Sequence, residues 1–307
     1  AENALTAGVA ALGETNPNIP ALRYNYGYEL RAGRDPSAES VLAAALRGYE
    51  GLYGQDSVEL LPVLMQLGAL HIETHYKSKL NLYYKRAMDI TAAEYGNDSW
   101  QYGRLLVQIG GDVAMGGPGF KARGLVTDGR EILAKTLGTE SVDYGLAAFT
   151  EAKIKMGKNR FEQATPLLNE ALNVFASPAD GDNRMELVTR AFLVRSLEEQ
   201  GASDEATKHC IAIGRLAPND GSQDAEPIYR VTPAYPGRAL SAGIAGNALV
   251  EFDIDEMGFV RKPRVVEWEG SALFGPAALQ AVKKFRYAPR FKDGVATIAR
   301  GEQHIIT

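Results

Sequence analysis

Two histidines four residues apart are the first candidates for chemistry in this chain. His71 and His75 would lie one turn apart on the same face of a helix, where two imidazoles can bind one metal ion. The order His-Ile-Glu-Thr-His differs from that of zinc-protease helices, in which the acidic residue directly follows the first histidine. No third ligand is evident in the sequence, so we expect no metal site.

A glycine-rich stretch and the other histidines are weak candidates for catalysis. Gly110-Gly111 and Gly116-Gly117-Pro118-Gly119 could suggest a phosphate-binding loop, but no lysine–threonine pair follows them and no strand is expected before them. A turn between helices explains them better. The remaining histidines are His209 and His304, and no nucleophile–base–acid triad can be assembled around either. We therefore expect a protein that is not an enzyme and has no cofactor.

Composition favours a protein with ordinary hydrophobic cores. The 307 residues are 45% hydrophobic, which suits roughly two domains of about 100 to 200 residues each. No stretch approaches the roughly 18 consecutive apolar residues of a membrane span. The start at Ala1-Glu2-Asn3, without methionine, is consistent with signal-peptide cleavage or with an artificial chain start. Cys210 is the sole cysteine, so no internal disulfide can form.

The charge is divided unevenly between the two ends of the chain. The net charge is -5, yet residues 230–307 contain eleven Lys and Arg against eight Asp and Glu, a balance of +3 that leaves about -8 for the remainder. Such a split supports two domains with different surfaces. Neither balance is basic enough to predict binding of nucleic acid.

The first two thirds of the chain repeat with a period of 42 residues. Small residues and capping serines recur together, whereas large apolar residues recur at a separate position. The serines are Ser57, Ser99 and Ser141; the small residues are Gly68, Gly110 and Ala152, and Ala45, Ala87, Gly129 and Ala171; the large residues are Tyr83, Leu125 and Leu167. Because two helices approach closely only where one of them presents a small side chain, this period predicts stacked helical hairpins.

The repeat has clear central units and atypical ends. A degenerate unit over residues 19–49 precedes three clear units, and a shortened one over residues 183–216 follows them, as expected for the caps of an α solenoid. The pattern resembles the tetratricopeptide repeat in its 42-residue variety, as in kinesin-light-chain-like arrays, although Leu64, Leu106 and Ala148 replace the hallmark tryptophan. The resemblance implies that an unidentified protein binds the concave face, through the non-repeating polar residues of the first helices.

The pattern changes near residue 218. Residues 219–226 are polar and predict a linker between a repeat domain, residues 1–218, and a second domain, residues 227–307. In the second domain, prolines at 233 and 236 predict an extended entry before a short helix over residues 237–242.

The remainder of the second domain predicts a small α+β fold. Apolar and polar residues alternate over 247–254 and continue after a turn over 259–268, which predicts a β-hairpin. An amphipathic helix is expected over residues 276–285, and a third strand within residues 294–306. We therefore expect a three-stranded antiparallel sheet with helices on one face.

These elements resemble the C-terminal domain of TonB energy transducers in their order and in their sequence motifs. The matching motifs are Pro233-Ala234-Tyr235-Pro236, Gly243-Ile244-Ala245-Gly246, Val250-Glu251-Phe252-Asp253-Ile254 and Ala281-Val282-Lys283-Lys284-Phe285-Arg286-Tyr287-Ala288-Pro289. In that family the domain binds the short TonB box of an outer-membrane transporter, which adds as a strand beside the last strand of the sheet. The resemblance implies these partner-binding residues: Pro233, Tyr235, Pro236, Val295, Ala296, Thr297, Ile298 and Ala299.

The two resemblances lead to two hypotheses of function. In the first, the chain is a periplasmic component of a TonB-type uptake system in a Gram-negative cell: its C-terminal domain binds a TonB-dependent receptor or a similar extended peptide, and its repeats recruit another protein. The chain would be secreted, or anchored to the inner membrane through a segment that this sequence lacks, in which case inner-membrane motor proteins would be partners. In the second, it is an envelope scaffold or assembly factor that binds protein or peptidoglycan without transducing energy.

Overall fold

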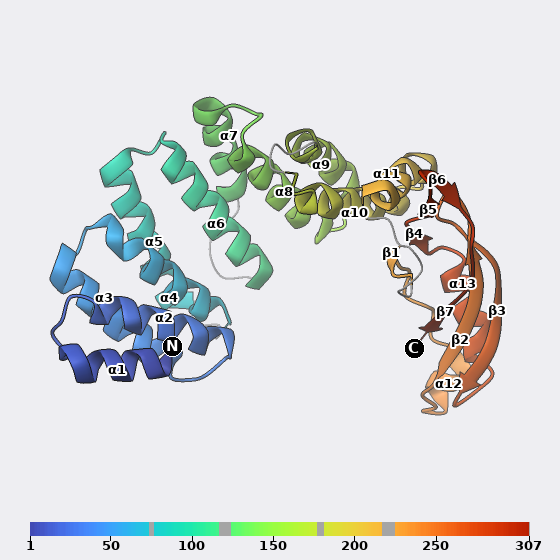
Figure 1. Ribbon diagram of the computed structural model, residues 1–307, viewed down its shortest axis with the longest axis horizontal. Helices are drawn as coiled ribbons and strands as arrows, with labels where there is room; N and C mark the ends of the chain where they lie inside the picture. The colour runs from blue at the N-terminus through green and yellow to red at the C-terminus, as the bar shows by residue number, and fades with distance from the viewer. Residues whose placement is uncertain (74–76, 117–123, 177–180, 217–224, 307) are drawn as a thin grey trace. The chain divides into compact units, whose positions relative to one another are not determined.

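A computed structural model gives the fold and describes residues 1–73, 77–116, 124–176, 181–216 and 225–306 (Figure 1). The chain divides into two compact units, Ala1–Ile154 and Lys155–Thr307, which are described separately. Most of the predicted linker, residues 219–224, lies outside the described residues. The domain limits at 218 and 227 therefore stay a prediction.

The first unit consists of helical hairpins at the predicted spacing. Helix α2 packs on α3, α4 on α5, and α6 on α7. A helix that the repeat pattern had not predicted, α1, packs on α2. The elements are α1 (Glu2–Leu12), α2 (Ile19–Ala32), α3 (Ala38–Tyr53), the short 3-10 helix η1 (Val58–Leu60), α4 (Leu61–Glu73), α5 (Lys77–Tyr95), α6 (Trp100–Gly116), α7 (Leu125–Leu137) and α8 (Val142–Met156), the last of which ends just inside the second unit.

The repeated small residues lie where the two helices of a hairpin touch. A Cβ atom on Gly68 would lie 2.3 Å from the Tyr84 ring, and one on Gly110 would lie 2.5 Å from a methyl group of Val126. Both distances are too short for a real side chain, so only glycine allows these helices to pack so closely. Gly110 and Gly111 are thus inside α6, and our expectation that they form a turn is wrong.

The repeated serines act as helix caps. The Ser99 hydroxyl accepts a hydrogen bond from the backbone N–H of Tyr102 at 3.2 Å, just before α6, and Ser141 accepts one from Tyr144 at 3.3 Å, just before α8. Ser57 does the same for η1, which leads into α4. The serine register therefore marks the start of each first helix.

The second unit combines the last helices with the predicted sheet. Its helices in the repeat region are α9 (Phe161–Phe175), α10 (Arg184–Glu199) and α11 (Ser203–Leu216), and α10 packs on both α9 and α11. The remaining elements are β1 (Pro227–Tyr229), α12 (Gly237–Ser241), β2 (Asn247–Ile254), β3 (Val260–Glu269), α13 (Phe274–Val282), β4 (Arg286–Tyr287), β5 (Arg290–Lys292), β6 (Val295–Thr297) and β7 (Ala299–Ile306). In Figure 1 these strands run from orange to red.

The main sheet has three antiparallel strands in the order β3-β2-β7. Every second residue of the central strand β2 is buried: Ala248, Val250, Phe252 and Ile254. Helix α13 packs on β2 and β3 and contributes Phe274, Ala278 and Val282 to the same core. The predicted fold class is confirmed, namely helical hairpins followed by a small α+β domain with a three-stranded antiparallel sheet.

The predicted third strand differs in detail from the observed one. Residues 294–306 form two strands instead of one: β6 pairs with β5 in a separate two-stranded sheet, and β7 alone joins the main sheet. Helix α13 also ends at Val282, so Phe285 is buried beyond the helix that we had expected it to belong to. A further two-stranded sheet, β1 with β4, was not predicted.

Candidate functional site

The outer edge of β7 is the first candidate site. On one side, β7 pairs with β2, and among the described residues no strand pairs with its other side. The register is regular over five consecutive pairs, from Ala248 opposite Ile306 to Phe252 opposite Glu302, and shifts only beyond Phe252, near Gly301. An edge strand with a regular register offers a row of backbone N–H and C=O groups to an extended peptide.

The opposite edge, β3, is less suited to adding a strand. Its pairing with β2 is irregular at two points, and Lys262 has a positive φ of 50°. Pro263 has no backbone N–H, and Arg261 and Arg264 are exposed beside it. Proline, irregular register and exposed cations are features that protect edge strands from pairing. The geometry therefore favours β7 over β3.

Side chains of β7 differ between its two faces. Glu302 accepts a hydrogen bond from Arg290 at 2.9 Å and one from the backbone N–H of Ala225 at 3.3 Å. The ring of His304 packs edge-on against buried Phe285. Burial lowers the pKa of His304, and nearby Arg230 lowers it further, so this imidazole is neutral at pH 7. On the other face, Ile305 is 60% exposed and could contact a bound segment.

Most of the predicted segment from Val295 to Ala299 precedes β7 in the chain and belongs to a different sheet. Val295, Ala296 and Thr297 form β6 and pair with β5, whereas Ile298 connects β6 to β7. Only Ala299 belongs to β7, and its side chain is buried. The open edge thus belongs to β7, the strand that follows most of the predicted contact residues in the chain.

The predicted Pro233, Tyr235 and Pro236 precede α12. The Tyr235 hydroxyl donates a hydrogen bond to the carbonyl of Ile244 at 2.7 Å, and its ring meets that of Phe274 edge-on. Half of the Tyr235 side chain is still exposed. The tyrosine therefore braces the domain and also presents a ring face to the solvent.

The exposed ring of Tyr235 belongs to a wider apolar end of the domain. Large apolar side chains are exposed on α12, on the loop after it, at the end of β3 and just before α13; they are Leu240, Ile244, Trp268 and Leu273. Ala248 pairs with both Trp268 and Ile306, so β7 ends at this end of the sheet. A peptide along β7 would run towards these apolar side chains.

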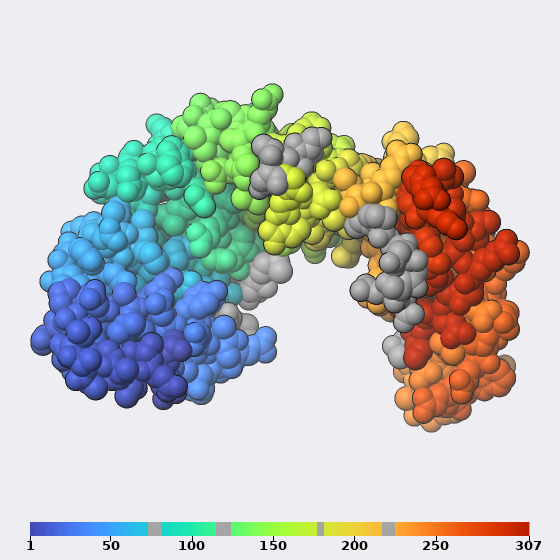
Figure 2. Space-filling model, in the orientation of Figure 1, coloured from blue at the N-terminus to red at the C-terminus, as the bar shows by residue number. Residues whose placement is uncertain are grey.

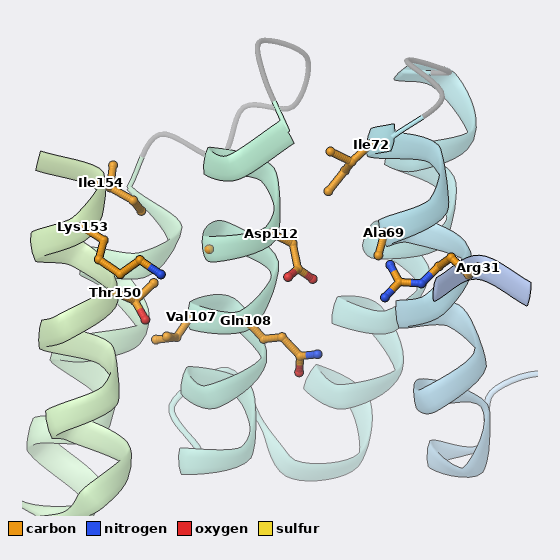
Figure 3. Close-up of a pocket in the computed structure, with 10 residues that line it drawn as sticks. Arg31, Ala69, Ile72, Val107, Gln108, Asp112, Thr150, Lys153 and Ile154 are labelled. Atoms are coloured by element: carbon orange, nitrogen blue, oxygen red, sulfur yellow. The ribbon is translucent and has the colours of Figure 1, made fainter. Parts of the chain in front are cut away.

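A pocket between first helices of the repeats is the second candidate site (Figure 3). It lies within the first unit and has a volume of about 540 Å³, within the range of ligand pockets. Helices α2, α4, α6 and α8 supply its walls, which consist of Arg31, Ala69, Ile72, Val107, Gln108, Gly111, Asp112, Thr150, Lys153 and Ile154. Figure 3 shows Asp112 and Arg31 extending towards each other from α6 and α2.

Two charged residues in this pocket break the repeat. Asp112 occupies the position of Leu70 and Ile154, and Lys153 occupies that of Ala69 and Gly111. The solenoid therefore does not need a charge at either position. Neither charge was predicted as a site residue from the sequence, although comparing positions 42 residues apart would have revealed both.

The environment of Asp112 fits a binding role better than a role in packing. Its carboxylate accepts a hydrogen bond from the Tyr84 hydroxyl at 3.1 Å. Burial raises the pKa of Asp112, against the opposing effects of that hydrogen bond and of Arg31. Burying a carboxylate costs free energy, so a charge that the fold does not require is a candidate for contacting a ligand.

The structure gives His71, one of the two candidate metal ligands, a role in packing. His71 is buried, its ring stacks on that of Tyr83, and its Nε2 lies 3.7 Å from a carboxylate oxygen of Glu39. His75 and residues 117–119 of the glycine-rich stretch lie outside the described residues. Among the described residues, no group of three or more His, Cys, Asp or Glu side chains is arranged so that it could hold a metal ion.

These features define the class of protein: a helical-repeat protein that ends in a small α+β domain with an open sheet edge. Residues 231–306 match the family model described as the Gram-negative bacterial TonB protein C-terminal. The C-terminal part of this chain is therefore a TonB C-terminal domain.

Two curated relatives match the same part of the chain. Protein TonB of Yersinia enterocolitica is 36% identical over 72 residues, which are 23% of this chain and 28% of that protein. Protein TonB of Vibrio cholerae is 31% identical over 71 residues, 23% of this chain and 29% of that protein. The chain therefore spans less than a third of the length of these relatives.

Two solved structures are similar to the helical part. BtubC from P. vanneervenii matches with 18% identity and a TM-score of 0.47, over 69% of this chain and 85% of that one. A putative kinesin light chain with TPR-like repeats from P. anserina matches with 14% identity and a TM-score of 0.48, over 65% of this chain and 95% of that one. The repeat is defined by the helical hairpins and by the 42-residue period of the sequence. No described helix is both long and apolar enough to cross a membrane.

Proposed function

We propose that this chain is a periplasmic, protein-binding component of a TonB-type outer-membrane uptake system. Its C-terminal domain would bind an extended segment of an outer-membrane receptor by strand addition along β7. The open, regular edge of β7 within a TonB C-terminal domain is the observation that carries this proposal. Backbone hydrogen bonds would supply most of the affinity, and side chains beside the edge would supply selectivity.

Residues at both ends of β7 would contact the same segment. Tyr235, with Pro233 and Pro236 beside it, lies at the end where β7 finishes, and its exposed ring could pack on the peptide. Residues 295–298 directly precede β7 and would meet the opposite end of the peptide, with Val295 the most exposed among them.

The helical repeats would recruit a second protein through the pocket between α2, α4, α6 and α8. Lys153 and Arg31 would bind acceptor groups of that partner, and Asp112 would bind a donor. If a membrane segment precedes this sequence in the full protein, inner-membrane motor proteins would be further partners and force could be transmitted. Without such a segment the chain would bind but not pull.

Calorimetry tests strand addition on the full chain. Synthetic peptides from the N-terminal segments of outer-membrane transporters should bind saturably. A lysine on an edge strand discourages pairing without removing a core side chain, so Ile305→Lys on β7 should weaken binding, and Val266→Lys on β3 serves as the matched control. Absence of binding at about 1 mM peptide, or an equal loss in both variants, would refute the proposed site.

The alternative is an envelope scaffold that binds protein or peptidoglycan without transducing energy, and the charged pocket favours it as a second candidate. A photo-cross-linking amino acid at exposed Gln108 should capture one defined partner in cells, and Asp112→Leu should abolish the capture. The same probe at exposed Val142, also on a first helix, is the control. Identical products from both positions would exclude the pocket as the binding site. Capture without any peptide binding by β7 would favour the scaffold.

A further inference from the structure

A buried arginine joins the TonB C-terminal domain to the last helices of the repeats. Arg286, in β4, is 2% exposed. Its guanidinium forms an ion pair with Glu198 of α10 and donates hydrogen bonds to Thr207 Oγ1 at 2.7 Å and to the Ser203 carbonyl at 3.4 Å, both on α11. Most of its polar partners are therefore outside the C-terminal domain to which it belongs.

Partners from within the domain complete the surroundings of this side chain. The guanidinium donates to the Met257 carbonyl at 3.2 Å and lies 3.7 Å from the centre of the Phe259 ring, in the turn between β2 and β3. Stacking on an aromatic ring and several directed hydrogen bonds suit the planar guanidinium and would not suit lysine. A buried cation persists only where such partners replace water, so separating the helices from the domain would leave the charge uncompensated.

Further contacts join α10 and α11 to the C-terminal domain. A Cβ atom on Gly214 of α11 would lie 2.5 Å from the Pro289 carbonyl oxygen, so the helix lies directly against the chain before β5. The Arg215 guanidinium lies 5.7 Å from the Phe291 ring, and Tyr229 donates a hydrogen bond to Glu199 at 3.3 Å. Helix α11 packs on β5, and in Figure 2 the yellow surface of α11 meets the red surface of the C-terminal strands.

We infer that α10 and α11 form a fixed seat for the TonB C-terminal domain, with Arg286 as the positioning residue. The domain is then held in one orientation on the last hairpin instead of moving freely on a linker. A load on β7 would pass into α10 and α11 through this contact. That consequence rests on the proposed function, but the seat itself does not, because it involves no bound peptide.

Distance measurement between two spin labels tests the seat in the full chain. Nitroxide labels would be attached at Lys208→Cys on α11 and Gln280→Cys on α13, both at exposed positions. Cys210 can stay in place because it is fully buried and burial raises its pKa to about 12, which makes the thiol unreactive. A fixed seat predicts one narrow distance distribution.

Single substitutions then test whether Arg286 holds the C-terminal domain on α10 and α11. Arg286→Met and Glu198→Gln should broaden the distribution, and Arg286→Lys should broaden it less. Arg290→Met is the matched control, since Arg290 pairs with Glu302 inside the domain, and it should change nothing. Circular dichroism checks that each variant keeps its helices and strands.

A second variant keeps the test decisive if Arg286→Met does not fold. Gly214→Ala leaves the ion pair in place but inserts a methyl group against Pro289, so it should also broaden the distribution. A broad distribution in the unaltered protein, or narrow distributions in folded Arg286→Met and in Gly214→Ala, would overturn the inference. Because no peptide is present, failure of the proposed strand addition would not affect this result.

Discussion

Replacement of a single glycine should distinguish the repeat packing from simple helix formation. Gly129 lies on α7 where the helix crosses α6, and a Cβ atom there would lie 2.6 Å from the Gly103 carbonyl oxygen and 2.8 Å from a methyl group of Val107. Gly51, near the end of α3, has no neighbouring atom within 4 Å of such a Cβ. The same change to alanine should therefore have opposite effects at the two positions.

The magnitudes follow from two competing terms. Alanine is favoured over glycine in a helix by about 0.5 to 1 kcal/mol, so Gly51→Ala should stabilise the protein by about that amount. At Gly129 the same gain is opposed by overpacking, which costs about 1 to 3 kcal/mol, and the high end applies because the backbone oxygen of Gly103 cannot rotate away. We expect Gly129→Ala to destabilise the protein by about 2 to 2.5 kcal/mol net, because the helix-propensity gain offsets only about 0.5 to 1 kcal/mol of the overpacking.

Urea unfolding followed by far-ultraviolet circular dichroism measures both variants. The unfolding midpoint should rise for Gly51→Ala and fall for Gly129→Ala, with little change in the slope. A midpoint for Gly129→Ala at or above that of the unaltered protein would show that α6 and α7 do not pack as closely as described.

Three further predictions concern single side chains. Asp112→Leu, which restores the residue found at position 70, should raise the stability by about 1 kcal/mol, because the added apolar burial exceeds the lost hydrogen bond from Tyr84; a clear loss in thermal unfolding would contradict this. Burial, with a smaller contribution from the nearby Arg190 cation, lowers the pKa of His209 to about 4, so the unfolded chain takes up a proton first and stability should fall as the pH drops from about 6.5 towards 4. His209→Gln should flatten that part of the pH profile, and an unchanged profile would count against this burial. Ser99→Ala should lower the free energy of unfolding by about 1 kcal/mol, because the N-terminus of α6 loses its cap. An unchanged free energy of unfolding in urea would show that Ser99 does not stabilise the helix.

The hairpins could be predicted because their close contacts leave marks in the sequence. Gly68 and Gly110 are small because a side chain would collide with the paired helix, and Ser99 and Ser141 bear the helix caps. A fixed spacing of such residues is typical of stacked helical hairpins. The alternation in β2 predicted the central strand for a similar reason, since its buried face packs against α13.

The division of the last strand was harder to predict, although one signal was present. Asp293 and Gly294 have φ values of 52° and 77°, the left-handed pair that a tight hairpin turn requires, and Asp-Gly is a known marker of that turn. It separates β5 from β6. Nothing comparable marks the change of sheet between Thr297 and Ala299, where the pairing partner of the chain changes from β5 to β2.

The buried arginine and the charged pocket depend on contacts between distant residues. Arg286 and Glu198 are 88 residues apart, so the local sequence gives no sign that this cation is buried. Asp112 and Lys153 were detectable as breaks in the repeat, but only the folded helices bring them into one pocket with Arg31. Local pattern thus predicts elements, whereas sites assembled from several elements require the fold.

A scan of N-methylated peptides tests strand addition along β7 most directly. A transporter-derived peptide that binds the full chain would be resynthesised with one backbone N–H methylated at a time, and each version titrated by calorimetry. Neighbouring residues of a strand direct their N–H groups to opposite edges, so only every second amide can bond to β7. We expect affinity to be lost at alternate positions and kept at those between. Equal affinity at all positions, or a loss confined to one side chain, would contradict strand addition.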